Sequence, residues 1–103
     1  MSTLEFEVRR NLQPKSVAER EAILEDPGFG EKFTDHMVDI CWSEKGGWHR
    51  PRIQPYGPIE LDPASAVLHY GQEIFEGIKA YRHADGSVWT FRPDANGRRL
   101  QAS

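Results

Sequence analysis

The sequence predicts an α+β domain in which a small antiparallel sheet carries two or three short helices. The first observation is period-two alternation of apolar and polar residues over 33–42, 74–82 and 87–91, which is typical of strands. The second is a pair of helix-start signals, a capping box at 16–19 and the dipeptide Asp62-Pro63. The third is that glycine-bearing turns separate the alternating segments, which favours antiparallel pairing of neighbouring strands.

The first 28 residues read as an arm followed by a short helix. Apolar residues alternate over residues 4–8 and Pro14 follows, a pattern that leaves an edge strand and a loose arm equally open. Residues 16–19, Ser-Val-Ala-Glu, can cap a helix because Ser and Glu side chains accept from each other's backbone N–H groups. We therefore expect a helix over 17–25, ended by Asp-Pro-Gly at 26–28.

Residues 33–56 read as two extended segments joined by a glycine loop. Residues 33–42 alternate as a strand whose expected buried face carries Val38, Ile40 and Trp42. A Gly-Gly loop over 43–49 leads back into the extended segment 50–56. Proline lacks the N–H that a central strand donates, so the two prolines of this segment predict an edge strand.

Asp62-Pro63 predicts a second helix, because Asp accepts from free N–H groups and Pro suits the first helical position. This helix must be short, since Tyr70-Gly71 follows and glycine lets the chain reverse.

The following residues predict a hairpin and a last helix. Segment 74–82 pairs with 87–92 around a turn at 83–86, and Pro93 begins the helix. Gly77 in mid-strand marks either a bulge or a place where a ligand or another backbone comes close.

Composition limits the class of protein. A chain of 103 residues is one domain at most, and its net charge of −3 offers no electrostatic footprint for nucleic acid. The single cysteine, Cys41, makes no internal disulfide, which suits a reducing compartment. The chain has no apolar run of about 18 residues, so we expect a cytoplasmic protein without a membrane segment.

Four histidines lack metal-ligand spacing, so no metal site is expected. His36 follows Asp35, but neighbours on a strand point to opposite faces and are not expected to form an acid–base pair.

Four segments in order carry a family resemblance: FTDHMVDICW at 33–42, RPRIQPYGPIELDP at 50–63, HYGQEIFEGIKAYR at 69–82 and FRPDANGRRL at 91–100. Together they resemble the amino-terminal part of a branched-chain amino-acid aminotransferase, a pyridoxal 5'-phosphate enzyme of fold type IV (the D-amino-acid-transaminase type). The resemblance implies that 29–103 is the smaller aminotransferase domain, truncated at its C-terminal end. The length of the match over 33–63 favours this family over D-amino-acid aminotransferases and aminodeoxychorismate lyases.

The resemblance assigns the cofactor phosphate to Arg99. A protein supplies such a cofactor with a lysine, a partner for the pyridine nitrogen and a cradle for the phosphate. A guanidinium meets a phosphate with two parallel charge-assisted bonds, although a solvated helix arginine is the commoner case for any single Arg. The Schiff-base lysine is expected beyond Ser103, and Lys79, the one lysine within a patterned strand, is not expected to replace it.

The resemblance also implies three substrate-binding residues, Tyr70, Phe75 and Phe29. The matching tyrosine reaches into the neighbouring subunit's pocket, and the matching phenylalanine at 75 lines its own. Phe29, between Gly28 and Gly30, resembles a third wall residue. A branched aliphatic substrate needs such an apolar, aromatic-lined slot. Ordinary core packing is the alternative for all three rings.

The expected activity is transfer of an amino group between leucine, isoleucine or valine and 2-oxoglutarate, in a homodimer. Two alternatives stay open. The chain by itself is a non-catalytic fragment or dimerisation module, or the parent enzyme is a sibling such as a D-amino-acid aminotransferase or aminodeoxychorismate lyase.

Overall fold

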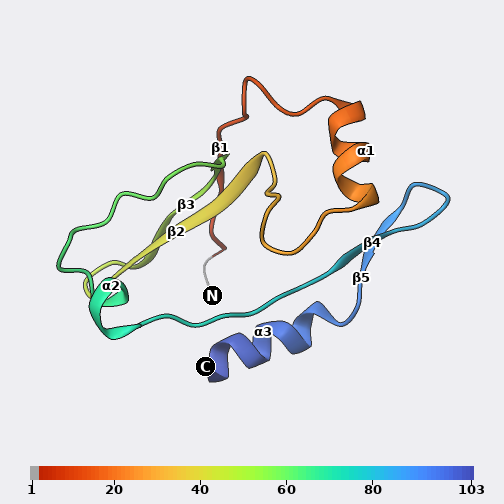
Figure 1. The fold of residues 1–103 in the computed structure, drawn as a ribbon. Coiled ribbons are helices and arrows are strands. Elements are labelled where there is room, and N and C mark those ends of the chain that lie inside the picture. Colours follow the sequence, from red (N-terminus) through yellow and green to blue (C-terminus); the bar gives the residue numbers. More distant parts are fainter. Residues whose placement is uncertain (1–2) are drawn as a thin grey trace. The chain divides into compact units, whose positions relative to one another are not determined.

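The computed structural model describes residues 3–103, and the chain divides into two compact units, Met1–Ile59 and Glu60–Ser103. The first unit contains strands β1, β2 and β3 and helix α1, and the second contains helices α2 and α3 and strands β4 and β5 (Figure 1). The expected α+β class is confirmed, with three helices and two small sheets among the described residues. The boundary expected at residue 29 stays a prediction.

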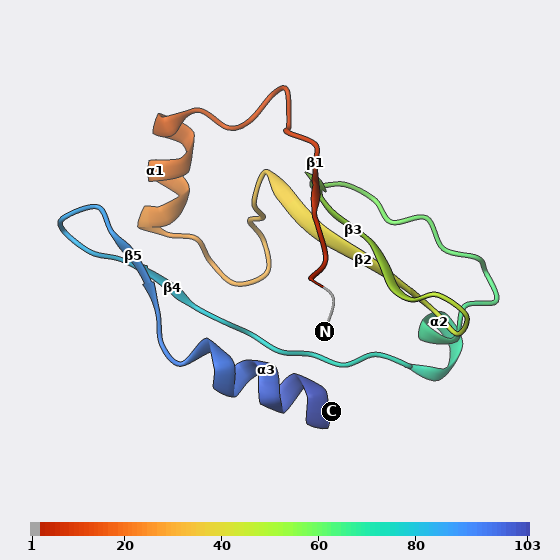
Figure 2. The same cartoon turned by 180° about the vertical axis from the view of Figure 1, so that it is seen from behind.

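The sheet of the first unit consists of β1 (Glu7–Val8), β2 (His36–Ser43) and β3 (Gly47–Pro55) in the order β1-β3-β2. Strands β2 and β3 are antiparallel neighbours and form the hairpin seen in Figure 2. Strand β1 runs parallel to β3, so the expectation of a purely antiparallel sheet is wrong for this strand. Of the two alternatives for the amino-terminal arm, the structure has the edge strand, reduced to two residues.

Strand β3 is central, so the prediction of an edge strand is wrong. The prolines are tolerated because β1 pairs with only two residues of β3, Arg52 and Ile53. On the other side the register shifts between Asp39 and Cys41, which sets one residue of β2 opposite two of β3 beside Pro51. Such a bulge interrupts the ladder where proline has no hydrogen to donate.

The prediction that Val38, Ile40 and Trp42 form a buried face of β2 is also wrong. Val38 is 62% exposed, Trp42 is 60% exposed, and Ile40 is half-buried. Trp42 lies opposite Trp48, which is 64% exposed. Alternation decides which residues share a face of a sheet, but another element must cover that face to bury it. No residue among 3–103 is fully buried.

Helix α1 (Val17–Glu25) has the predicted bounds. Its capping box is formed, because Ser16 Oγ accepts from the Glu19 N–H at 3.2 Å and the Glu19 carboxylate accepts from the Ser16 N–H at 2.7 Å. The two bonds satisfy donors that a helix start otherwise leaves unpaired.

Helix α2 (Ala66–Tyr70) is the short second helix that the sequence predicts, but it starts later than Asp62-Pro63. Asp62 instead closes a turn, with its carboxylate accepting from the Ala64 N–H at 2.7 Å, and Ser65 is the N-cap. The helix ends as expected at Gly71, whose φ of 57° is the left-handed conformation that glycine adopts readily.

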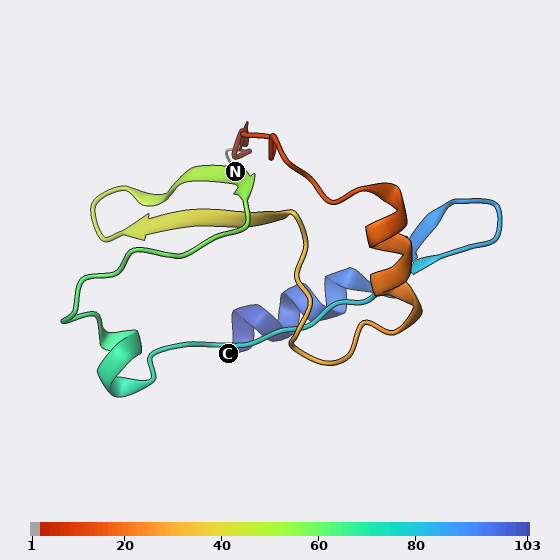
Figure 3. The ribbon, with the colours of Figure 1, turned by 45° about the horizontal axis from the view of Figure 1, so that its top comes forward.

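The hairpin consists of β4 (Ala80–Arg82) and β5 (Val88–Thr90). Its antiparallel pairing is confirmed, but the expected span of 74–82 with 87–92 is too long. Arg92 has a φ of 47° and turns the chain into α3 (Pro93–Ala102), so β5 ends too early to face residues 74–79. Figure 3 shows that those residues form an extended segment leading from α2 into β4.

Gly77 lies in this extended segment rather than in mid-strand. A Cβ placed on it would meet only Phe75 Cζ, at an ordinary 3.8 Å, among the described residues. Among the described residues the structure therefore contains neither the bulge nor the close approach of another backbone expected at this glycine, and the approach of a ligand stays a prediction. The helix predicted from Pro93 onward is confirmed as α3.

Candidate functional site

Arg99 lies in the last turn of α3 and its side chain is 67% exposed. Its Nη1 donates to Glu76 Oε1 at 3.1 Å and lies 3.0 Å from Glu76 Oε2. Asn96 precedes Arg99 by three positions, so both side chains lie on one face of the helix. This face meets the extended segment between α2 and β4, because Glu76 belongs to that segment.

The Glu76 carboxylate is the centre of this contact. Its Oε1 also accepts from Asn96 Nδ2 at 2.8 Å and from the Gly77 N–H at 3.1 Å. Asn96 Nδ2 donates a second bond, to the Gly77 carbonyl at 2.9 Å. The Glu76 side chain is only 9% exposed, although Arg99 beside it is open to solvent. We call Glu76, Asn96 and Arg99 the Glu76 cluster.

The cluster keeps this carboxylate ionised. The pKa of Glu76 lies below its ordinary value, chiefly because Asn96 donates to the charged form, while burial acts in the opposite direction. The Gly77 N–H and the Arg99 guanidinium lower the pKa further. At neutral pH, Arg99 is therefore held by an anion of its own unit.

The side-chain hydrogen bonds of Arg99 within residues 3–103 use Nη1 alone. The opposite edge of the guanidinium, Nε and Nη2, presents two parallel N–H groups on a largely exposed side chain. That pair of donors matches two oxygens of a phosphate or carboxylate. The geometry can therefore bind an anion at Arg99 while Glu76 holds the other edge.

The three rings expected to line a substrate slot are all exposed. Tyr70 is 86% exposed, Phe75 81% and Phe29 99%. Core packing within each unit, the alternative for these rings, is therefore not what the structure shows. Tyr70 and Phe75 belong to the same unit as Arg99, whereas Phe29 belongs to the first unit.

Two residues of the cluster, Glu76 and Asn96, are not among the residues that the sequence singles out. A signal for Glu76 exists, because in the alternating pattern it shares a face with the apolar residues Ile74 and Ile78. A carboxylate on such a face needs hydrogen-bond partners. The three-residue spacing of Asn96 and Arg99 on a predicted helix supplies two candidates.

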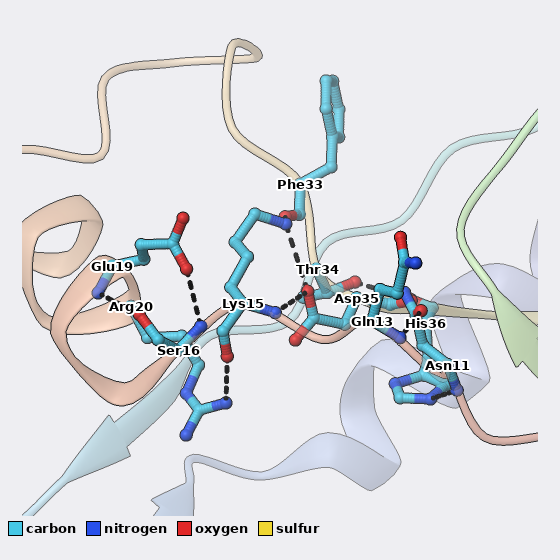
Figure 4. A network of polar contacts seen from close by, with 10 residues as sticks. All are labelled: Asn11, Gln13, Lys15, Ser16, Glu19, Arg20, Phe33, Thr34, Asp35 and His36. Atoms are coloured by element: carbon cyan, nitrogen blue, oxygen red, sulfur yellow. Dashed lines mark hydrogen bonds and ion pairs between the residues drawn. The ribbon is translucent and has the colours of Figure 1, made fainter.

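The first unit contains a separate polar network around Asp35 (Figure 4). The Asp35 carboxylate accepts from both the backbone N–H and the ammonium of Lys15, each at 3.2 Å. The backbone bond from Lys15 is the main cause of a lowered Asp35 pKa. His36 turns elsewhere, and its Nε2 accepts from the Asn11 N–H at 2.9 Å. Asp35 and His36 therefore form no acid–base pair, as their adjacent positions predict.

A hollow of about 410 Å³ lies beside α1 in the first unit. Its walls combine apolar side chains of α1 and the following loop with basic ones, and they consist of Lys15, Arg20, Ile23, Leu24, Pro27, Lys32, Phe33, Thr34, Asp35 and His36. Phe29 is not among these lining residues, so the hollow differs from the predicted substrate slot.

Among residues 3–103 there is no cluster of three side chains suited to a metal ion, and none of the described helices has the length and hydrophobicity of a membrane span.

Comparison with known proteins identifies the relatives of this chain. It is 60% identical over 97% of its length to the branched-chain-amino-acid aminotransferase of Mycolicibacterium smegmatis, covering 27% of that protein. It is 59% identical over its whole length to a probable branched-chain-amino-acid aminotransferase of Streptomyces coelicolor, covering 28% of that protein. The mitochondrial branched-chain-amino-acid aminotransferase of Saccharomyces cerevisiae is 44% identical over 95% of the chain and 24% of its own length. No protein-family model matches the chain.

By sequence the chain is homologous to aminotransferases along nearly its whole length. In particular it is homologous to branched-chain-amino-acid aminotransferases, and it spans about a quarter of the length of these relatives. The resemblance noted from its four segments is thereby confirmed.

Proposed function

We propose that this chain is the amino-terminal, cofactor-phosphate-binding part of a branched-chain amino-acid aminotransferase of fold type IV. The enzyme would move an amino group between leucine, isoleucine or valine and 2-oxoglutarate. The observation that carries the proposal is the 60% identity over 97% of the chain to a protein of that name. Identity at this level along the chain supports a shared fold for this part, and the chemistry is then argued from its side chains.

The side chains fit one of the three needs of a pyridoxal phosphate site. Arg99 has two parallel donors on its Nε–Nη2 edge and is 67% exposed, so an anionic phosphate could reach it. When bound, pyridoxal phosphate would supply an electron sink for breaking bonds at the amino-acid α-carbon. The lysine that bonds the cofactor is not assigned to this chain. Lys79, the one lysine of the second unit, stays without that role in this proposal.

The exposed rings are the proposed contacts for the substrate side chain. Tyr70 ends α2 directly before the extended segment, and Phe75 lies within that segment next to Glu76, so both residues are within six positions of Glu76 along the chain. A branched aliphatic side chain would remove apolar surface of such rings from water. Phe29, 99% exposed between two glycines, is the proposed third wall. We assign Tyr70 to the site of the neighbouring subunit in a homodimer.

The expected location is the cytoplasm, where the half-buried free thiol of Cys41 would stay reduced.

The test is transaminase activity in the protein that carries this sequence. Purified protein is supplied with pyridoxal phosphate and 2-oxoglutarate and then with L-leucine, L-isoleucine, L-valine or D-alanine, and glutamate formation is measured. The proposal expects turnover of the three branched L-amino acids and little of D-alanine. Preference for D-alanine would instead identify a D-amino-acid aminotransferase, and absence of both activities would contradict the proposal.

A second candidate applies to the 103 residues by themselves, namely a non-catalytic module that contributes only to dimer contact. The exposed tryptophans favour it, since Trp42, Trp48 and Trp89 are each 60% to 64% exposed. Large exposed apolar side chains mark association surfaces. The 103-residue chain is mixed with pyridoxal phosphate and its absorption spectrum is recorded. A lysine-dependent band that disappears on changing Lys15, Lys32, Lys45 or Lys79 would contradict the module and our placement of the catalytic lysine.

A further inference from the structure

The geometry of the second unit points to a positioning role for Glu76: its carboxylate holds Nη1 of Arg99 so that the Nε–Nη2 edge is presented to the phosphate of the cofactor. This inference rests on the proposed function, because it needs Arg99 to bind that phosphate. Asn96 has a supporting part, since it fixes the carboxylate that holds the arginine.

The first argument is the contrast in exposure within one ion pair. The Arg99 side chain is 67% exposed and the Glu76 side chain 9% exposed. An ion pair exposed at both ends usually contributes little to stability, and an exposed arginine samples many rotamers. Here one end of the pair is fixed in the unit, so the free movement of the guanidinium is reduced.

The second argument is how the carboxylate itself is fixed. Oε1 of Glu76 accepts three bonds, from Asn96 Nδ2 at 2.8 Å, the Gly77 N–H at 3.1 Å and Arg99 Nη1 at 3.1 Å. Oε2 is buried, and it has no hydrogen-bond partner among the described residues, although Arg99 Nη1 lies 3.0 Å away. A buried carboxylate oxygen without a hydrogen-bond partner costs folding free energy unless a positive charge stays beside it, and here that charge is the Arg99 guanidinium. The burial of Glu76 therefore ties the carboxylate to Arg99.

The third argument is the donor geometry that remains. A guanidinium has a fixed planar fork, so holding Nη1 sets the direction of the other N–H groups as well. The Nε–Nη2 edge offers two parallel bonds to one phosphate. An arginine oriented before binding loses less entropy when the anion arrives.

An opposite effect is also built into this arrangement, and it makes the inference testable. A carboxylate next to a phosphate repels it, so removing the charge of Glu76 would strengthen phosphate binding if repulsion were its main effect. Positioning predicts weaker phosphate binding after the same change. The sign of the change separates the two effects.

The experiment compares pyridoxal phosphate with pyridoxal, which lacks the phosphate, on cofactor-free protein that carries this sequence. Dissociation constants for both are measured by calorimetry. The dissociation constant of pyridoxal divided by that of pyridoxal phosphate reports the contribution of the phosphate alone, and this ratio falls when the phosphate is bound less tightly. We expect Glu76→Gln to reduce this ratio about threefold to tenfold and Asn96→Ala to reduce it less. Glu73→Gln, the same charge change on the same segment, is the matched control and should leave the ratio unchanged. A general loss of structure would weaken both ligands and leave the ratio as it was.

Arg99→Ala and the double variant with Glu76→Gln complete a cycle. If Glu76 acts through Arg99, the double variant has the same ratio as Arg99→Ala alone. If Arg99→Ala lowers the ratio but Glu76→Gln leaves it unchanged or raises it, the positioning role is overturned and the proposed function stands. If Arg99→Ala leaves the ratio unchanged, the phosphate role of Arg99 in the proposed function fails. Should Glu76→Gln not fold, Asn96→Ala takes its place, and an unchanged ratio in that variant overturns the inference.

Discussion

Replacing Arg99 by alanine tests the residue on which the cofactor proposal depends. The change removes the Nε–Nη2 donors offered to a phosphate and leaves Glu76 without its cationic neighbour. A hydrogen bond to a charged group contributes roughly 1.5–3 kcal/mol. Because the Arg99 side chain is 67% exposed, water screens the contact, and we take the lower end of that range. A loss of about 1.5 kcal/mol raises the dissociation constant of pyridoxal phosphate about tenfold.

The assay is a titration of cofactor-free protein with pyridoxal phosphate, followed by calorimetry. Arg99→Lys should fall between the parent protein and Arg99→Ala, since an ammonium keeps the charge but lacks the planar fork. Arg98→Ala is the control from the same helix. Arg98 pairs with Asp94 at 2.8 Å across one exposed turn and has no part in the Glu76 cluster. Equal affinity in the parent protein and in Arg99→Ala, or an equal loss in Arg98→Ala, would refute the reasoning.

Three further predictions concern stability and protonation. Ser16→Ala removes the N-cap of α1 and should destabilise that helix by about 1 kcal/mol. Amide hydrogen exchange across the helix should therefore be faster in Ser16→Ala than in Ser16→Thr, which keeps the capping hydroxyl. Equal exchange rates in the two variants would contradict this. Gly71→Ala should lower the free energy of unfolding by about 1 kcal/mol because its φ is 57°, whereas Gly97→Ala, in helix α3, should raise it by about 0.5–1 kcal/mol. Urea denaturation measures both, and midpoints that shift in the same direction would be inconsistent with these backbone conformations. The Asp35 pKa is lowered by Lys15, so this carboxylate stabilises the fold above its ordinary pKa of 3.8, and the contribution is lost as pH falls through the lower value in the folded state. A carboxyl-carbon NMR titration should give a midpoint below 3.8, and a midpoint at or above it would be contrary to the contact.

Local signals predict the elements of this chain well. The bounds of α1 follow from its capping box, which depends on residues three positions apart. The end of α2 follows from Gly71, and the start of α3 from Pro93, because each depends on the backbone preference of one residue. Antiparallel pairing of β2 with β3 and of β4 with β5 follows from alternation and short glycine turns.

Local signals fail where the structure depends on contacts between residues that are distant in the sequence. The parallel position of β1 beside β3 depends on residues more than 40 positions apart in the sequence. Pro51 and Pro55 predict an edge strand, yet a two-residue neighbour and a bulge let β3 be central. The length of the β4–β5 hairpin depends on where Arg92 turns the chain away.

For the candidate site as well, some features follow from local sequence signals and others from long-range contacts. The sequence by itself determined that Arg99 lies on a helix begun by Pro93, that Tyr70 stands at a helix end, and that the chain resembles one aminotransferase family, because residue type and local spacing suffice for each. Only the tertiary structure decided that Glu76 and Asn96 meet Arg99. The physical reason is that a hydrogen bond across 20 or more residues exists only once the chain has folded back, and no local preference encodes which carboxylate the guanidinium will then face.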